Sequence, residues 1–279
     1  GAAVLGERLL GLSARRSLPR FSPPFLPPMT GRRSEGPEVL LFVDTFNRHF
    51  EPENARAAVR VLEAAGYAIR YPDPPGDRPL CCGRTFLAAG LIDQARTEAR
   101  RTVEALAPMV ERGVPVVGLE PSCLLTMRDE LEALLPGGIG ALAEVAKLFA
   151  EFVVEERAAG RFQIDLAPLG GEALVHGHCH EKAFGAFGPV LETLRLIPGL
   201  EPTAIDSSCC GMAGAFGYDA EHYDVSMTMA ELSLLPAVRS APSEALLVAD
   251  GTSCRHQIRD GSGRDAVHLV RLLDRALAA

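Results

Sequence analysis

The chain has 279 residues, of which 47% are hydrophobic and 23% charged, and its formal net charge is −8 at pH 7. A chain of this length can bury the core of one large or two medium domains. The acidic balance gives no bulk attraction to nucleic acid or to an anionic membrane surface. No apolar run reaches the roughly 18 to 20 residues that a transmembrane segment needs. Seven cysteines in a long chain argue against a disulfide framework and favour free thiols in a reducing compartment, so we expect a cytoplasmic protein.

Residues 1–37 differ in composition from the rest of the chain. The stretch SLPRFSPPFLPPMTGRRSEGP is rich in proline and arginine and has no apolar period. Proline removes a backbone donor and disfavours helix in the residue before it. We therefore expect a linker or arm that connects to an upstream part of a larger protein, with a disordered tail as the alternative.

From residue 38 onward, short apolar runs alternate with longer helical patterns. The expected strands are 38–43, 68–71, 114–120, 172–178, 201–205 and 244–250. The expected helices are 52–65, 85–112, 124–134, 141–159, 182–194, 221–234 and 266–277. Apolar strands followed by crossover helices predict parallel sheets covered on both faces.

The order of elements repeats along the chain, and so does the triplet Cys-Cys-Gly. It occurs at 81–83 and again at 209–211; Cys123 follows Cys82 by 41 residues, and Cys254 follows Cys210 by 44. We infer an α/β fold of two pseudo-symmetric repeats, each a small parallel sheet flanked by helices. The domains are then a linker at 1–37, a degenerate first repeat at 38–158 and a second repeat at 159–279, joined by the helix at 141–159.

All seven cysteines lie at the ends of expected elements, which predicts a metal site at the rim formed by the carboxyl ends of the strands. The second repeat supplies four thiols, enough for a [4Fe–4S] cluster or for zinc: Cys179, Cys209, Cys210 and Cys254. The first repeat supplies three, Cys81, Cys82 and Cys123, with Asp44 where a fourth ligand is expected. A carboxylate in place of a thiolate weakens an iron–sulfur site, so we expect the second repeat to hold the stronger one.

Histidines lie close to these cysteines. HGHCHEK places three of them around Cys179, and His256 follows Cys254 by two residues. Strand alternation would point the three histidines to one side and Cys179 to the other. Of the three, we retain His178 and His180; with His256 they are predicted to ligate the metal or to donate hydrogen bonds to cluster sulfur. The alternative is that these imidazoles are hydrogen-bonded side chains at a polar strand end and have no role at a metal.

The pattern Cys, then Cys-Cys-Gly, then Cys resembles the cysteine-rich CCG-domain family. That family includes a cysteine-rich component of heterodisulfide reductase and the iron–sulfur subunits of glycolate, lactate and glycerol-3-phosphate dehydrogenases. HGHCHEKA, SSCCGMAGAFGY and DGTSCRHQI are most similar to the carboxyl-terminal part of large FAD-linked D-2-hydroxyacid oxidases. The resemblance covers about residues 38–277. It implies a parent protein or complex in which a flavin domain and a ferredoxin-like module accompany the CCG repeats.

The sequence also departs from the family pattern. Full repeats begin with a cysteine and end in CxxC, whereas Asp44 stands at the first leading position and neither Cys123 nor Cys254 begins a CxxC. The five-thiolate sites that the resemblance implies for heterodisulfide reductase are therefore incomplete here.

Three functions remain open from the sequence. The first is an electron-transfer segment that relays electrons from FAD in the parent protein through a [4Fe–4S] cluster; the chain alone has no flavin motif and is not expected to be catalytic by itself. The second is a zinc-binding structural or interaction module that uses the same thiolates. The third is a thiol-active enzyme. Association with the inner face of the membrane through the electron acceptor is compatible with the first.

Overall fold

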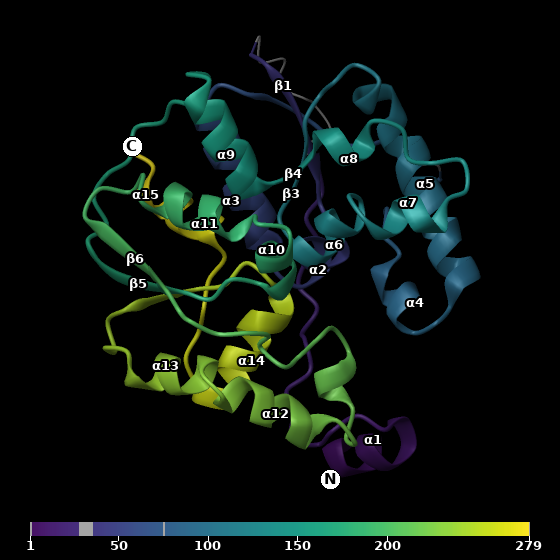
Figure 1. The fold of residues 1–279 in the computed structure, drawn as a ribbon, viewed down its shortest axis with the longest axis vertical. Helices are drawn as coiled ribbons and strands as arrows, with labels where there is room; N and C mark the ends of the chain where they lie inside the picture. The colour runs from purple at the N-terminus through teal and green to yellow at the C-terminus, as the bar shows by residue number, and fades with distance from the viewer. Residues whose placement is uncertain (1, 28–35, 75, 279) are drawn as a thin grey trace. The chain divides into compact units, whose positions relative to one another are not determined.

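The computed structural model describes residues 2–27, 36–74 and 76–278, and it divides into two compact units. The first repeat unit comprises residues 21–167 and 273–279, and the second repeat unit comprises residues 1–20 and 168–272. Each unit contains one parallel sheet (Figure 1). The α/β architecture of two small parallel sheets flanked by helices, expected from the sequence, is confirmed.

The first repeat unit has a four-stranded sheet in the order β2-β1-β3-β4. Its elements are β1 (Glu38–Phe42), α2 (Thr45–His49), α3 (Pro52–Ala64), β2 (Ala68–Arg70), α4 (Arg84–Ala88), α5 (Ile92–Val110), β3 (Val116–Gly118), α6 (Pro121–Thr126), α7 (Glu130–Leu134), α8 (Leu142–Val145), β4 (Ala146–Leu148) and α9 (Phe149–Ala158). The central strand β1 is buried from Val39 to Phe42 because it has a neighbour on each side and is covered by helices.

The second repeat unit has a three-stranded sheet in the order β6-β5-β7. Its elements are α1 (Ala2–Leu10), β5 (Gly171–Val175), α10 (Cys179–Ala183), α11 (Phe187–Leu194), β6 (Leu200–Ala204), a 3-10 turn (Phe216–Tyr218), α12 (Tyr223–Glu231), α13 (Leu234–Ser240), β7 (Leu246–Val248) and α14 (Thr252–Ser262); α15 (Leu269–Ala276) is the last helix along the described chain. Leu174 of β5 faces Thr203 on one side and Leu247 on the other. All six strands expected from the sequence are present.

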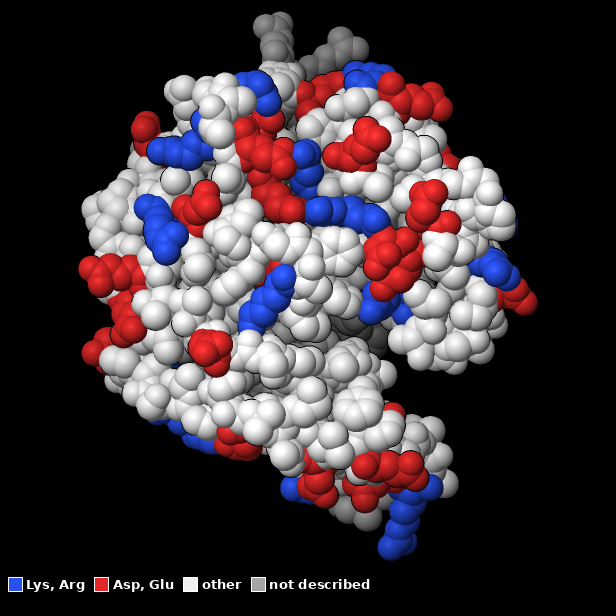
Figure 2. Space-filling view, viewed as in Figure 1, with Lys and Arg blue, Asp and Glu red and all other residues white. Residues whose placement is uncertain are grey.

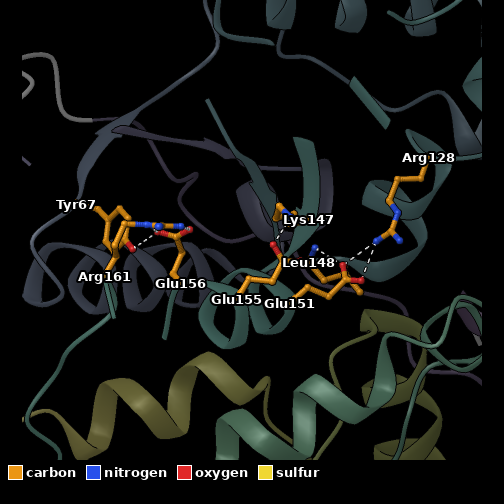
Figure 3. Close-up of polar contacts among 8 residues, drawn as sticks. All are labelled: Tyr67, Arg128, Lys147, Leu148, Glu151, Glu155, Glu156 and Arg161. Atoms are coloured by element: carbon orange, nitrogen blue, oxygen red, sulfur yellow. Dashed lines mark hydrogen bonds and ion pairs between the residues drawn. The ribbon is translucent and has the colours of Figure 1, made fainter. Parts of the chain in front are cut away.

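The single helix expected at 141–159 is wrong. The chain there forms α8, the edge strand β4 and α9 in succession, since β4 pairs in parallel with β3. Glu151 enforces the break: its carboxylate accepts a hydrogen bond from the Leu148 amide at 2.9 Å and two from Arg128 at 2.8 and 2.9 Å (Figure 3). Strand pairing and a capped helix start therefore override the helical pattern of the sequence.

Other expected helices also break where backbone geometry requires it. The helix expected at 85–112 is two helices, α4 and α5, because Gly90 adopts φ +72° between them. The short helix α2 and the longer α14 were not expected. Both begin within the loops that follow strands, so the cysteine Cys254 lies inside a helix instead of at a loop tip.

The outer side of α9 carries further links within the first repeat unit. Glu156 accepts a hydrogen bond from the Tyr67 hydroxyl at 2.7 Å and forms a two-pronged ion pair with Arg161 (Figure 3). Lys147 of β4 pairs with Glu155. These contacts attach α9 to the strand edge and to the buried ring of Tyr67, which packs edge-on against Phe152.

The amino-terminal segment differs from the extended linker expected at 1–37. Residues 2–10 form α1, and the segment after it packs onto the second repeat unit, where Leu12 forms a β-bridge with Asp219. Arg16 is buried and donates hydrogen bonds to the carbonyl of Gly217 and the hydroxyl of Ser226, both at 2.8 Å. Residues 28–35 of the expected linker lie outside the described residues.

Charged side chains of both signs are interspersed on the face shown in Figure 2. Many of them form local ion pairs, such as Arg239 with Glu231 and Arg259 with Asp265. Within the described ranges, no helix combines the length and the apolar character that a bilayer crossing would require.

Arg16→Ala should destabilise the second repeat unit by about 3 kcal/mol. The substitution leaves the Gly217 carbonyl, the Ser226 hydroxyl and Asp260, 3.6 Å from the guanidinium, without their buried cation. Chemical denaturation of the full chain measures the loss. Arg20→Ala, at an exposed position of the same segment, is the control and should change stability by less than about 0.5 kcal/mol. Equal effects of the two substitutions would contradict a structural role for the segment.

Candidate metal centre

The seven cysteines are free thiols and occupy matching places in the two repeat units. The first cysteine of each Cys-Cys-Gly triplet, Cys81 or Cys209, is half-buried, and the second, Cys82 or Cys210, is buried. In both triplets the sulfur of the first cysteine accepts a hydrogen bond from the glycine amide, at 3.5 Å in the first repeat and 3.3 Å in the second. The triplets therefore have the same local structure, as a duplicated unit predicts.

The trailing cysteines are also equivalent. Cys123 is the third residue of α6, after the cap residue Glu120, and Cys254 is the third residue of α14, after the cap residue Gly251. Both helices follow the strand that pairs with the central strand of their sheet. A helix amino terminus favours a thiolate over a thiol, so this position suits a metal ligand.

The glycine of the second triplet is required by the packing. Gly211 has φ +87°, and a Cβ atom there would lie 2.2 Å from the Ser226 carbonyl oxygen of α12. Ser226 is in turn held by Arg16 and by Gln257, whose side-chain amide donates to the Ser226 carbonyl at 3.0 Å. In the first triplet, Gly83 (φ +80°) approaches the carbonyl of Ala95 in the same way. Each triplet is therefore pressed against a helix backbone.

The four thiols of the second repeat form one connected cluster. Hydrogen bonds with Cys179 and Cys210 lower the pKa of Cys209, and a hydrogen bond with Cys210 lowers the pKa of Cys254 despite its burial. The pKa values of Cys179 and Cys210 are raised, first by hydrogen bonding with Cys209 and then by burial or a further thiol. The structure thus brings together the four thiols that the sequence predicts as ligands.

The three thiols of the first repeat have a different electrostatic balance. The pKa of Cys81 is raised by hydrogen bonding with Cys82 and by burial, and the pKa of Cys82 is raised by hydrogen bonding with Cys123. Hydrogen bonding with Cys82 lowers the pKa of Cys123, but burial and the charge of Asp44 outweigh it and raise the value to about 11. The pKa values of all three thiols are therefore raised, and the expectation of a weaker first site stays a prediction.

Asp44 serves as the cap of α2. One carboxylate oxygen accepts hydrogen bonds from the amides of Phe46 and Asn47, and the other accepts from the Asn47 side chain at 2.7 Å. Thr45, the first residue of α2, hydrogen-bonds with Cys81. In the second repeat, Cys179 is likewise the first residue of α10 and interacts with Cys209.

Thr45, and not Asp44, therefore occupies the place of the leading cysteine. A metal ion at Asp44 would compete with three cap hydrogen bonds. The ligand role of Asp44 stays a prediction.

The histidines do not follow the strand alternation expected from the sequence, because β5 ends at Val175. His178 caps α10, and its Nδ1 accepts a hydrogen bond from the His180 amide at 3.2 Å. Burial lowers the pKa of His178. Its ring also approaches Cys254: a Cβ added at Gly251 would lie 2.4 Å from one atom of the His178 ring and 3.2 Å from the Cys254 sulfur.

The other two predicted histidines have contacts of their own, and the backbone amide of His180 hydrogen-bonds with the Cys179 thiol. His180 is half-buried and packs edge-on against His178 with 5.2 Å between ring centres. His256 is half-buried on α14, and its Nδ1 lies 2.9 Å from the Tyr218 hydroxyl. A role for either histidine toward a cofactor stays a prediction.

The sequence reasoning missed His176. Its ring is 1% exposed, and one ring nitrogen lies within 4.8 Å of the sulfur atoms of Cys210 and Cys254, which are themselves within that distance of each other. Strand alternation gave His176 no priority over its neighbours. The signal that could have found it is its position directly after a fully buried strand end, since a polar side chain there needs a partner.

The residues present fit a thiolate-bound metal or iron–sulfur cluster. Four thiolates close together and largely out of water repel one another, so a bound cation is needed to hold them ionised. The buried imidazole of His176 lies beside two of them, Cys210 and Cys254. Thiolate and imidazole are the donors typical of zinc, iron and iron–sulfur centres.

Comparison with known proteins agrees with this chemistry. Residues 41–128 match the family model described as CCG, a cysteine-rich domain, which confirms the resemblance inferred from the sequence. The chain is 30% identical to one subunit of the anaerobic glycerol-3-phosphate dehydrogenase of Escherichia coli over 86% of its own length and 59% of that protein. It is 27% identical to D-2-hydroxyglutarate dehydrogenase of Escherichia coli over 84% of its length and 22% of the relative. It is 25% identical to lactate utilization protein A 1 of Bacillus mycoides over 85% of its own length and 96% of that protein.

Gly211→Ala should disrupt the second repeat more than Gly214→Ala does. Both positions have positive φ, which costs a non-glycine residue about 1 to 2 kcal/mol. At Gly211 the added methyl group also meets the Ser226 carbonyl, and such overpacking costs about 1 to 3 kcal/mol more. At Gly214 the methyl group meets nothing within 4 Å.

Denaturation of both variants, with metal analysis of the purified proteins, measures this difference. We expect Gly214→Ala to keep the metal content of the unaltered protein and Gly211→Ala to lose most of it. Indistinguishable variants would argue against the close approach of the triplet to α12.

Proposed function

We propose that this chain, whose residues 41–128 match the cysteine-rich CCG domain, is an electron-transfer segment in which Cys179, Cys209, Cys210 and Cys254 hold a [4Fe–4S] cluster. The observation that carries the proposal is the connected cluster of these four thiols in the second repeat unit. When bound, such a cluster accepts and passes on single electrons.

The protein's own contribution is ligation, burial and orientation. Cys210 and Cys254 are buried, whereas Cys179 and Cys209 are half-buried and form the side of the cluster nearer to solvent. The amides at the start of α10 and α14 and the Gly211 amide point partial positive charge at the sulfurs, which favours the thiolate form. His178, His180 and His256 are proposed to tune the centre as neighbours.

The source of electrons is proposed to be a flavin domain, with FAD, in the same protein or complex, next to a ferredoxin-like module. Two of the relatives are named as a dehydrogenase or as part of one, and the third is named for lactate utilization, which supports an oxidoreductase acting on a 2-hydroxyacid or a related substrate. This chain spans 59% of the first relative and 22% of the second, so the activity of the whole assembly rests on further parts. We propose a cytoplasmic location, with contact to the inner face of the membrane through the electron acceptor as an alternative.

A zinc-bound structural or interaction module is the second candidate. The close approach of Cys210, Cys254 and His176 supports it, because ligand atoms within 4.8 Å of one another suit a single ion. Zinc has no redox chemistry of its own, so this module would not relay electrons.

Anaerobic purification of the full chain, with iron, sulfide and zinc analysis, tests the proposal. We expect about four irons and four sulfides per chain and an electron paramagnetic resonance signal after dithionite reduction. Cys209→Ser should abolish all three, because it removes a thiolate that contacts both Cys179 and Cys210.

Cys81→Ser is the matched control, since Cys81 holds the equivalent place in the first triplet. It should leave iron and sulfide unchanged. Stoichiometric zinc without sulfide would replace the electron-transfer proposal by the zinc module. Loss of the cluster in Cys81→Ser as well would contradict a site confined to the second repeat.

A further inference from the structure

His176 is a buried side chain that lies beside two thiols of the second repeat, Cys210 and Cys254. The residue follows the last residue of β5, and its backbone amide donates to the Val248 carbonyl at 2.8 Å, which fixes the start of the side chain. The ring is 1% exposed. Within the described residues, the buried Nε2 atom has no partner of ordinary hydrogen-bond geometry, while the ring hydrogen-bonds with the Cys254 thiol and helps to lower the pKa of that thiol. A buried imidazole nitrogen without such a partner costs free energy, so it requires an explanation.

Ser207 determines which nitrogen of His176 carries the proton. The His176 Nδ1 atom lies 2.8 Å from the Ser207 hydroxyl oxygen. That hydroxyl has one proton, which it donates to the Ile205 carbonyl at 3.3 Å, and its oxygen also accepts from the Lys182 ammonium group at 3.5 Å. With the hydroxyl proton on the Ile205 carbonyl, we assign Nδ1 as the donor toward Ser207. In a neutral imidazole this leaves Nε2 with a bare lone pair.

His178, which lies near the same thiols, carries its proton on the other ring nitrogen. Its Nδ1 accepts the amide hydrogen of His180, so in the neutral ring the proton is on Nε2. A Cβ added at Gly251 would lie 3.2 Å from this Nε2 and also 3.2 Å from the Cys254 sulfur, so the two atoms flank the same point. His178 therefore lies near Cys254 and acts on it through charge, whereas His176 hydrogen-bonds with the Cys254 thiol.

A nitrogen lone pair that faces two sulfur atoms is stable only if a proton or a metal cation lies between them. Protonated thiols could supply a proton, but the thiols that hold a metal are deprotonated. A lone pair facing thiolates would then be repulsive unless it also binds the metal. The ring nitrogen, Cys210 and Cys254 have ligand atoms within 4.8 Å of one another, and ligands of one tetrahedral metal lie about 3.5 to 3.8 Å apart, so a small contraction brings them together.

We propose that His176 is a ligand of the metal centre through Nε2, and that Ser207 and Lys182 act as positioning residues that hold its tautomer. The inference rests on the proposed function in that it concerns the same thiolate site. Each iron of a [4Fe–4S] cluster takes one protein ligand, so His176 takes the place of one of the four thiolates there, or joins Cys210 and Cys254 on a single ion. A nitrogen donor in place of a thiolate lowers the negative charge of an iron–sulfur centre and raises its reduction potential.

Pulsed electron paramagnetic resonance on the anaerobically purified full chain tests the ligand. Protein labelled with ¹⁵N-histidine should show a directly coordinated nitrogen coupled to the reduced centre, and His176→Ala should lose this coupling. Ser207→Ala should weaken or shift it, since Nδ1 loses its partner. The reduction potential of His176→Cys, which restores a thiolate, should be lower than that of the unaltered protein.

The control is His222→Gln, because His222 stacks on Phe216 and contacts Asp219 away from the thiol cluster. It should leave both the coupling and the potential unchanged. A protein with full iron and sulfide but no coordinated nitrogen would overturn the His176 assignment and leave the electron-transfer proposal standing.

If the unaltered chain carries no iron or sulfide, the electron-transfer proposal fails and Co²⁺ titration of the metal-free protein tests His176 separately. His176→Ala should then weaken Co²⁺ binding more than about 10-fold, because loss of a group that only hydrogen-bonds a ligand costs about 10- to 100-fold and loss of a ligand is at least as severe. Unchanged Co²⁺ affinity and an unchanged visible spectrum would overturn the assignment as well.

Discussion

Parallel pairing of one central strand with two neighbours is the constraint on which each repeat unit depends. In the second unit, β5 pairs with β6 and β7 in the same direction, so the loops that leave all three strands emerge at one edge of the sheet. Those loops carry the leading cysteine, the Cys-Cys-Gly triplet and the trailing cysteine. Residues separated by up to 75 positions in the chain, from Cys179 to Cys254, thereby become one thiol cluster. An antiparallel pairing would have sent at least one of the loops to the opposite edge.

The comparison of the two units shows what the cluster needs beyond the sheet. Both units keep the triplet, its glycine and the trailing cysteine at the third position of a helix. They differ at the first residue of the helix after the central strand, which is Cys179 in one and Thr45 in the other. With a hydroxyl in that place, the remaining three thiols all have raised pKa values. In the second unit the pKa values of Cys209 and Cys254 are lowered while those of Cys179 and Cys210 are raised, so the two groups of thiols differ in their electrostatic balance.

The sequence predicts the strands well and the helices less well. The strands β1, β3 and β7 are short apolar runs that are mostly buried, and that pattern has few alternatives; β2, β6 and the start of β5 are more exposed. The sequence at 141–159 does have a helical apolar pattern. Pairing of β4 with β3 and the cap at Glu151 nevertheless interrupt the helix, and neither contact can be recognised from the sequence of this segment alone. The thiol ligands were predictable because the triplet repeats. Thr45 and His176 were not, since the first depends on the register of a helix cap and the second on a hydroxyl, Ser207, that lies 31 residues away.

Charge explains why an imidazole is suited to the remaining place in the second repeat. Four thiolates already bring a large negative charge into a largely buried volume, and the positive groups near them are mainly helix amides. The buried Arg255 of α14 is engaged with the carbonyls of Ala249 and Asp250, so its charge is directed elsewhere. A further thiolate in the place of His176 would add repulsion, whereas a neutral nitrogen there supplies a donor without adding charge. The lack of a second cysteine after Cys254 and the tautomer of His176 are then two parts of one electrostatic arrangement.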